Sequence, residues 1–348
     1  MSGPLIPTLA NGPRRSYGAH CALAALLSLT CVVTGCSKGG SASAVGVGAD
    51  LVPVEPKTWA EAIAAIQASD GEQASSLYQG LEIAEDPSLV PIGMNPQTGF
   101  WEFVHRASGV PGKQIPRRNA ATGRLVPDVD MGVVLVLLPS GQVPVGDDLP
   151  RLRRNDVVLA PFFIAKYEVT QAQWQRITGS GNPSFFKHQP NAPLLPVDGV
   201  PWDRAEKELD RVGLVLPTEL QWEYGCRAGT TTRWWTGSTP ESLRGKASYD
   251  AWDPQPVGLW QPNAFGLYDT AGTVYEWCRD QAGHYGHERE GDGFRIDRAS
   301  RGGKRVCRSG RHGLLALAGS SGSRSSMLQV ARNRHLGIRA AKAVRLPD

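Results

Sequence analysis

Glycine and proline interrupt this chain so often that it has little room for long regular elements. The sequence contains 40 glycines and 26 prolines among 348 residues. Both residue types favour turns, because glycine tolerates left-handed backbone angles and proline fixes φ and lacks a backbone donor. Hydrophobic residues still make up 41% and charged residues 20% of the chain, as in globular proteins. We therefore expect a globular chain of short elements, and we exclude a disordered, collagen-like or coiled-coil chain.

Tryptophan predicts where the core of that fold lies. The sequence contains ten tryptophans, and eight of them fall between Trp174 and Trp277. Each indole buries a large apolar area when it packs. A dense aromatic core is therefore expected in the second half of the chain.

The first 36 residues have the pattern of a targeting segment. Arg14 and Arg15 precede an apolar run from Cys21 to Val33. This run is shorter than the roughly 20 residues that span a bilayer, and it has the length of a signal-peptide core. It leads into the tetrapeptide Val33–Cys36, which resembles a bacterial lipobox. The resemblance implies that Cys36 is lipidated and becomes the new N-terminus.

These features predict a signal peptide over residues 1–35 and a flexible Ser/Gly/Ala-rich tether over residues 36–55. An ordinary secretory signal with an accidental cysteine is the alternative. With a lipid anchor, the membrane becomes a partner of the chain. Ser37 rather than aspartate follows the cysteine, which in lipoproteins implies the outer membrane. The expected location is thus the bacterial cell envelope, as an outer-membrane lipoprotein facing the periplasm or the exterior.

Cysteine usage leaves three thiols in the exported chain, namely Cys226, Cys278 and Cys307. At most two of them can pair, and whether Cys226 pairs with Cys278 stays open. At least one thiol must therefore be free. Such a thiol is either reactive, metal-binding or simply a buried hydrophobic group.

Three capping boxes predict where helices begin. A threonine followed three residues later by Glu or Gln satisfies two free backbone donors, and this pattern begins at Thr58, Thr170 and Thr218. The predicted helices are Thr58 to Gly71, Thr170 to Gly179, Asp203 to Val212 and Thr218 to Arg227, with a weaker one from Glu72 to Ala84. Residues 56–127 are expected to form a partly helical extension that packs on the main domain.

Strand signals begin at Met131. A continuous apolar run at 132–138 predicts a buried strand, and residues 157–169 are a second predicted strand region. Short helices combined with such strands, without regular βαβ alternation or an internal repeat, predict an α+β fold.

Segments of the second half occur in an order that resembles the formylglycine-generating enzyme family, also called sulfatase-modifying factors. The strongest block is LPTELQWEY, Leu216–Tyr224. The other matching segments are Met131–Pro139, Phe162–Thr170, Asn182–Ser184, Pro196–Val197, Val200–Trp202, Asn263–Asp269, Gly272–Trp277, Arg301–Gly303 and Leu336–Arg339. The resemblance implies that residues 128–348 adopt the family's irregular mixed α/β fold, which is related to C-type lectins.

The same resemblance implies a copper site, from which this chain departs. Formylglycine-forming members hold Cu(I) between two cysteines, since soft thiolates suit that ion. Cys307 stands at the first of these positions, but His312 stands at the second, and Lys304 replaces a serine beside the active centre. These departures argue against standard formylglycine chemistry. The alternatives are a mixed Cys307–His312 copper site, a thiol activated by neighbouring arginines, or purely structural roles for both residues.

The resemblance also implies a structural calcium ion. The matching ligands are the side chains of Asp269 and Glu276 and the carbonyls of Gly272 and Val274. Carboxylates and backbone carbonyls are the hard oxygen ligands that Ca²⁺ prefers. The alternative is that the two acids cap turns. A nearby cluster, His284, His287 and Glu288, is interpreted as a solvated loop.

Basic residues gather at the C-terminal end. Residues 301–348 contain eleven lysines and arginines and one acid, although the whole chain has a net charge of only +4. Arg301 and Arg339 fit the family pattern, and the excess is Lys304, Arg305, Arg308, Arg311, Arg324, Arg332 and Arg334. We expect a cationic pocket for an anionic glycan or a peptide, and no nucleic acid for an exported lipoprotein.

The function expected from these observations is a divergent ligand- or partner-binding module. The alternative is a copper-dependent oxidoreductase that acts on a protein cysteine or a small thiol through Cys307. Copper retention that requires His312 would favour the oxidoreductase, and capture of anionic glycans or cell-wall material would favour the binding module.

Overall fold

The computed structural model describes residues 50–68, 76–146, 157–248, 251–283, 292–294, 303–312 and 319–347. All of them belong to one of two compact units, Val45–Asp348. The predicted signal peptide, Cys36 and most of the tether lie outside the described residues. Within these ranges, none of the helices has the length and apolar character needed to cross a membrane.

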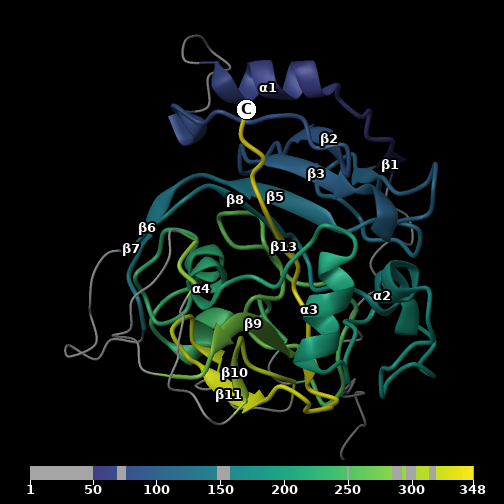
Figure 1. The fold of residues 1–348 in the computed structure, drawn as a ribbon, viewed down its shortest axis with the longest axis vertical. Coiled ribbons are helices and arrows are strands. Elements are labelled where there is room, and N and C mark those ends of the chain that lie inside the picture. Colours follow the sequence, from purple (N-terminus) through teal and green to yellow (C-terminus); the bar gives the residue numbers. More distant parts are fainter. Residues whose placement is uncertain are drawn as a thin grey trace, which may run out of the picture. The chain divides into compact units, whose positions relative to one another are not determined.

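A five-stranded antiparallel sheet forms the centre of this unit (Figure 1). Its strand order is β13-β8-β5-β3-β2. The middle strand, β5, pairs Val136 with Ile164 of β8 on one side and with Glu102 of β3 on the other. The strands are β2 (Leu89–Met94), β3 (Trp101–His105), β5 (Val134–Leu138), β8 (Phe162–Ala165) and β13 (Ala341–Ala343).

The two predicted strand regions are confirmed, but the prediction that strands begin at Met131 is wrong. β5 lies inside the run 132–138, and the region 157–169 contains β7 (Val157–Leu159) and β8. β2 and β3 come earlier, in the segment 56–127. β3 pairs with β5, so this segment contributes two strands to the main sheet as well as packing on it.

The three capping boxes form as predicted. In each one, the threonine accepts from the third backbone N–H of the helix, and the Glu or Gln side chain accepts from the threonine N–H. The helices are α1 (Trp59–Gln67), α2 (Gln171–Thr178), α3 (Trp202–Asp210) and α4 (Glu219–Arg227). α1 ends earlier than Gly71.

The predicted helix from Glu72 to Ala84 is wrong where the structure describes it. Only a 3-10 turn, η1 (Ser76–Tyr78), forms there. The Tyr78 hydroxyl donates to the Leu137 carbonyl and accepts from the Trp101 N–H, so this turn is fixed against the main sheet. The other described 3-10 turns are η2 (Arg106–Ser108), η3 (Ala192–Leu194) and η4 (Pro240–Leu243).

A second, four-stranded sheet holds the residues on which the copper and calcium expectations depend. Its order is β11-β10-β9-β12, and only the β9–β12 pair is parallel. The strands are β9 (Tyr275–Gln281), β10 (Lys304–Arg308), β11 (Ser325–Leu328) and β12 (Leu336–Gly337). Two small pairs complete the described strands: β1 (Leu51–Val52) with β4 (Arg118–Asn119), and β6 (Gly141–Val143) with β7.

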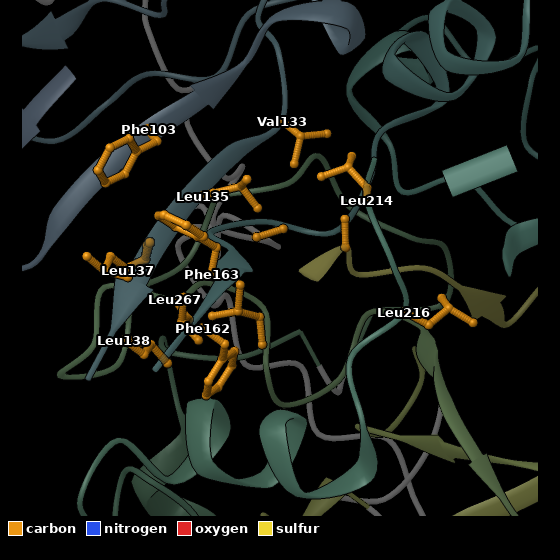
Figure 2. Packing of buried hydrophobic residues seen from close by; sticks show 14 of the residues in the cluster. Phe103, Val133, Leu135, Leu137, Leu138, Phe162, Phe163, Leu214, Leu216 and Leu267 are labelled. Atoms are coloured by element: carbon orange, nitrogen blue, oxygen red, sulfur yellow. The ribbon is translucent and has the colours of Figure 1, made fainter. Parts of the chain in front are cut away.

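The core lies between the main sheet and the helices and strands that cover it. In Figure 1, α1 lies on one side of the main sheet, while α3, α4 and the second sheet lie on the other. Figure 2 shows Leu138, Phe162 and Leu267 close together in this packing. The expected aromatic core in the second half is confirmed, because Trp174, Trp222, Trp234 and Trp277 are fully buried. Trp252, in contrast, is 88% exposed.

Candidate functional site

Cys307 lies in the middle of the second sheet. On β10 it is paired with Trp277 of β9 and Ser325 of β11, and its side chain is fully buried. Burial raises the pKa of the Cys307 thiol to about 12, and the opposing effects of Ser325 and Arg308 are smaller. Since the thiolate is the nucleophile and the metal ligand, Cys307 at neutral pH is a protonated, buried thiol.

Two of the arginines that could activate Cys307 are bound to other side chains. Arg308 is fully buried and pairs with two carboxylates, at 2.5 Å from Glu223 and 3.2 Å from Glu219. The Arg305 guanidinium stacks 3.6 Å from the centroid of the Trp202 ring. Arg308 does lower the pKa of Cys307, but burial has the larger effect.

These contacts also reduce the expected cationic pocket. Arg324 donates to both Glu219 oxygens, at 2.7 and 2.9 Å, and is therefore structural like Arg305 and Arg308. Lys304, Arg332 and Arg334 are exposed. The half-buried Arg311 donates to the carbonyl of His312. Only part of the basic excess therefore reaches the surface.

His312 is bound to a histidine that the sequence analysis did not single out. Its Nδ1 lies 2.6 Å from the Trp252 carbonyl, and its Nε2 lies 2.9 Å from Nδ1 of His335. The Phe186 ring packs edge-on against it. The structure therefore brings His312 to His335, whereas Cys307 is paired with Trp277 and Ser325 in the second sheet. His335 is adjacent in sequence to the Leu336–Arg339 block, and that position was the only available signal.

The other two thiols are buried as well. Cys226 and Cys278 are free, so the pairing left open by the sequence does not form. Burial raises the pKa of Cys226 to about 11 and that of Cys278 well above its usual range. All three described cysteines therefore behave as core residues.

The predicted calcium segment adopts an unusual backbone. Asp269 and Thr273 both have a φ of +60°. Aspartate tolerates this left-handed region, whereas it is an outlier for a β-branched residue such as threonine. Ser309, which has a φ of +68°, donates its hydroxyl to the Gly272 carbonyl. The loop before β9 is therefore held in its shape by its surroundings.

The four predicted calcium ligands differ in their availability. One Asp269 oxygen accepts from the Gly258 N–H at 2.7 Å, while the other is buried without a hydrogen-bond partner. Both Glu276 oxygens accept from Arg339, each at 2.8 Å, and one also accepts from the Trp222 indole. The pKa of Asp269 is raised to about 6, mainly by burial and to a smaller extent by the charge of Glu276, against the opposing effects of the Gly258 N–H and Arg339.

Glu168 is a site residue that the sequence analysis missed. It is 1% exposed, and apart from the Val274 N–H, which has a small lowering effect on its pKa, no donor in the described ranges forms a hydrogen bond with its carboxylate oxygens. Burial raises the pKa of Glu168 well above its usual range, followed in effect by the charges of Asp269 and Glu276. The only indication of Glu168 in the sequence was that an acid follows β8 by three positions, within the segment Phe162–Thr170.

The fit of this region to Ca²⁺ rests on these unpartnered oxygens. A buried carboxylate oxygen without a donor is costly unless it is protonated or binds a cation. Asp269 and Glu168 have such oxygens, whereas Arg339 already neutralises Glu276. Within the described ranges, no three His, Cys, Asp or Glu side chains form a metal cluster. Calcium would therefore need backbone carbonyls and water as further ligands.

Other sites from the sequence fall elsewhere. His284, His287, Glu288 and Cys36 lie outside the described residues. Two surface hollows of about 330 and 380 Å³ are lined by residues of the segments 77–87 and 345–346 together with Pro139, Ser140 and Pro161, and none of the predicted site residues borders them.

Comparison with protein families identifies the domain. The sulfatase-modifying factor enzyme 1-like domain matches residues 127–344, well over half of the chain. The formylglycine-generating enzyme of Bos taurus is 26% identical over 347 residues, covering 86% of this chain and 89% of that protein. That of Thermomonospora curvata is 30% identical over 174 residues, covering 42% of this chain and 54% of the enzyme.

Other relatives share only a part. The serine/threonine-protein kinase pkn1 of Chlamydia pneumoniae is 30% identical over 178 residues, which cover 43% of this chain and 28% of the kinase. The chain spans about half or less of the length of several curated relatives that it matches.

Solved structures agree with the fold. Treponema denticola variable protein 1 superposes with a TM-score of 0.54 at 24% identity, covering 62% of this chain and 98% of that one. PvdO from Pseudomonas aeruginosa gives 0.51 at 23% identity, covering 61% and 95%. At these identities the likeness establishes the α+β fold. Together with the matched residues, it shows that the chain belongs to the sulfatase-modifying factor enzyme 1-like domain family.

Proposed function

We propose that this chain is an exported, lipid-anchored member of the family that binds a ligand or partner instead of oxidising a thiol. The observation that carries the proposal is the state of Cys307. Its thiol is fully buried and its pKa is raised to about 12. The second copper position holds His312, which is bonded to Trp252 and His335.

The surface around His312 supports an anionic ligand. Arg332 donates to the Gly199 carbonyl. Gly199 packs so closely on the Phe185 ring that a Cβ there would lie 3.1 Å from it, so Gly199 links Arg332 to Phe185. Arg334 contacts His335 at 3.3 Å. Phe185 is 57% exposed, and Trp252 is more exposed still. We call the set Phe185, Trp252, Arg311, Arg332 and Arg334 the cationic surface.

This composition favours a glycan or peptide that carries carboxylates or sulfates. Guanidinium groups bind such anions with paired donors, and the exposed rings offer apolar contact area. Among the described residues of the basic excess, Arg308 is buried, and Arg305 and Arg324 are half-buried and bound to other side chains, which does not favour the continuous basic surface that follows a nucleic-acid backbone. The cationic surface is therefore proposed for an anionic glycan or peptide, not for nucleic acid.

The test uses an oligogalacturonate and an oligoglutamate peptide as probes in titration calorimetry. We expect the Arg332→Ala/Arg334→Ala double variant to bind at least tenfold more weakly, about 1.4 kcal/mol, and salt to weaken the wild type. Arg244→Ala, another exposed arginine, is the matched control and should bind normally. Equal binding by all three proteins would overturn the proposed surface.

The same preparation tests the oxidoreductase alternative. Wild type and Cys307→Ser are incubated with Cu(I), oxygen and a cysteine peptide, and the peptide is followed by mass spectrometry. We expect no oxidised product from either protein. A product formed by the wild type and lost in the variant would favour the copper-dependent oxidoreductase and contradict the binding module.

Calcium is proposed as a structural ion of this domain. The unpartnered oxygens of Asp269 and Glu168 would supply its negative ligands, and the Gly272 and Val274 carbonyls are its proposed backbone ligands. Adding calcium to EDTA-treated protein should raise the thermal midpoint, because a ligand that binds only the folded state stabilises it. Asp269→Asn should reduce that rise. An unchanged midpoint in the wild type would show that calcium does not stabilise the folded domain and would overturn this proposal.

Export and lipidation are tested at Cys36. We expect metabolic labelling with a palmitate analogue to mark the wild type and fractionate it with the outer membrane. Cys36→Ser should lose the label. A soluble, unlabelled wild-type chain would support the ordinary secretory signal instead.

A further inference from the structure

His312 and His335 form a close pair of imidazole rings. The two ring centroids are 4.4 Å apart with an interplanar angle of 50°, and the facing nitrogens are 2.9 Å apart. His312 is 1% exposed, whereas His335 is half-buried. His312 follows β10 and His335 directly precedes β12, and the pair contacts Arg311 and Arg334 of the cationic surface.

The hydrogen bonds fix which nitrogen of His312 can act as a ligand. A carbonyl only accepts, so the bond to Trp252 places the hydrogen of His312 on Nδ1. Its Nε2 is then a lone pair that points at His335. Metal-binding imidazoles usually have this arrangement, in which the other ring nitrogen donates to a carbonyl or carboxylate. His312 is thus oriented in the same way as a metal ligand.

We propose that His312 Nε2 and His335 Nδ1 form a two-imidazole site for a divalent transition-metal ion such as Cu²⁺ or Ni²⁺. Metal–imidazole bonds are about 2.0–2.1 Å long, so nitrogens 2.9 Å apart subtend an angle of about 90° at the metal. This matches the tetragonal preference of Cu²⁺ and Ni²⁺ better than a tetrahedral ion. The site goes beyond the proposed function and does not depend on it.

Metal binding requires one proton to move. In the metal-free pair, His335 donates its Nδ1–H to His312. The metal needs the lone pair on His335 Nδ1, so this proton leaves Nδ1 and solvent delivers one to His335 Nε2, which keeps the imidazole neutral. Both rings turn so that their lone pairs converge on the metal, beside the line that joins the two nitrogens. The 3.3 Å contact with the Arg334 Nε–H then breaks, because both groups are donors. Arg334 is exposed and can turn into solvent.

The surrounding charges are mixed. Arg311 and Arg334 act against a cation at His335, while Asp253 acts in its favour at His312. No third His, Cys, Asp or Glu of the described chain joins the pair in a metal cluster. Water or an anion held by the arginines would therefore complete the coordination. A moderate affinity follows, since two imidazoles supply all of the protein ligands.

The experiment is a Cu²⁺ titration of the purified full chain, followed by calorimetry and electron paramagnetic resonance. His312→Asn keeps a donor for the Trp252 carbonyl, and His335→Asn keeps a donor for His312, so both substitutions remove a ligand while preserving a hydrogen bond. His188→Asn, at an exposed histidine, is the matched control. Circular dichroism confirms that each variant is folded.

We expect one Cu²⁺ per chain with nitrogen hyperfine structure in the wild type and in His188→Asn. Each of the other variants should bind at least tenfold more weakly and lose part of the nitrogen splitting. Wild-type binding in folded His312→Asn or His335→Asn would overturn the proposal, as would a wild type that binds no copper. A signal that requires Cys307, shown by its loss in Cys307→Ser, would also overturn it.

Discussion

Asp269 links the chemistry of one buried carboxylate to the stability of the whole domain. Its pKa is about 6 in the folded state against 3.8 ordinarily, mainly because of burial. The folded state therefore holds this proton more tightly than the unfolded state. The resulting stability is present below about pH 4 and is lost as the pH rises through 6.

This sign gives a prediction for metal-free protein. In EDTA, the free energy of unfolding by urea should fall between pH 4 and 6 by up to about 3 kcal/mol from Asp269. Asp269→Asn, which tolerates the positive φ, should lack that component. Asp198, whose pKa is also raised to about 6, is present in both proteins and cancels in the difference. Parallel pH profiles would contradict the burial of a titrating Asp269.

Single residues also show where sequence reasoning ends. Family spacing located Cys307 and His312, but it could not show that one is buried in a sheet and the other bonded to His335. Glu168 lies about 100 positions before Asp269, and His335 lies 23 positions after His312. Their proximity depends on tertiary folding, which has no local sequence signal.

At the scale of elements, the capping boxes were predictable and the strands β2 and β3 were not. Threonine caps are local hydrogen bonds, so sequence alone specifies them. β2 contains Pro91 and Gly93, which usually mark turns, and β3 contains the fully buried Glu102. Lys166 and Arg118 neutralise Glu102, each at 2.7 Å. Glu102 can therefore be buried in β3 because Arg118 and Lys166, which lie outside this strand, neutralise it. The local sequence of β3 does not indicate these partners.

The ionic network of Glu219, Glu223 and Arg308 joins α4 to β10. Arg308→Met should destabilise the protein by about 3–5 kcal/mol, because it leaves two buried carboxylates without this partner. Urea unfolding measures the loss. Lys113→Met, which removes an exposed pair 3.9 Å long, should cost at most about 1 kcal/mol. Similar losses in the two variants would show that the Arg308 network is not buried.

For the whole molecule, the fold class was predictable and the contribution of residues 56–127 was only partly so. The ordered family segments and the tryptophans indicated the α+β domain and its core, as the match over residues 127–344 shows. The extension was expected to pack on this domain. It also supplies β2 and β3, so the main sheet is assembled from both regions.

This assembly predicts that the matched domain does not fold alone. A chain beginning at residue 128 would leave β5 as an uncovered apolar edge, which favours aggregation. We expect it to lack a cooperative thermal transition by near-ultraviolet circular dichroism. A chain beginning at Asp50 keeps every described strand and should melt cooperatively. Equal midpoints for both chains would contradict the structural role of β2 and β3.

The proposed binding module depends on Cys307 being a buried core thiol. The most direct test is alkylation of the native protein by iodoacetamide at neutral pH, with each cysteine followed by mass spectrometry. Cys226 and Cys278 are buried internal controls in the same molecule. We expect all three thiols to react with iodoacetamide only after the protein unfolds. Rapid native labelling of Cys307, with Cys226 and Cys278 still protected, would contradict it and point to a reactive thiol.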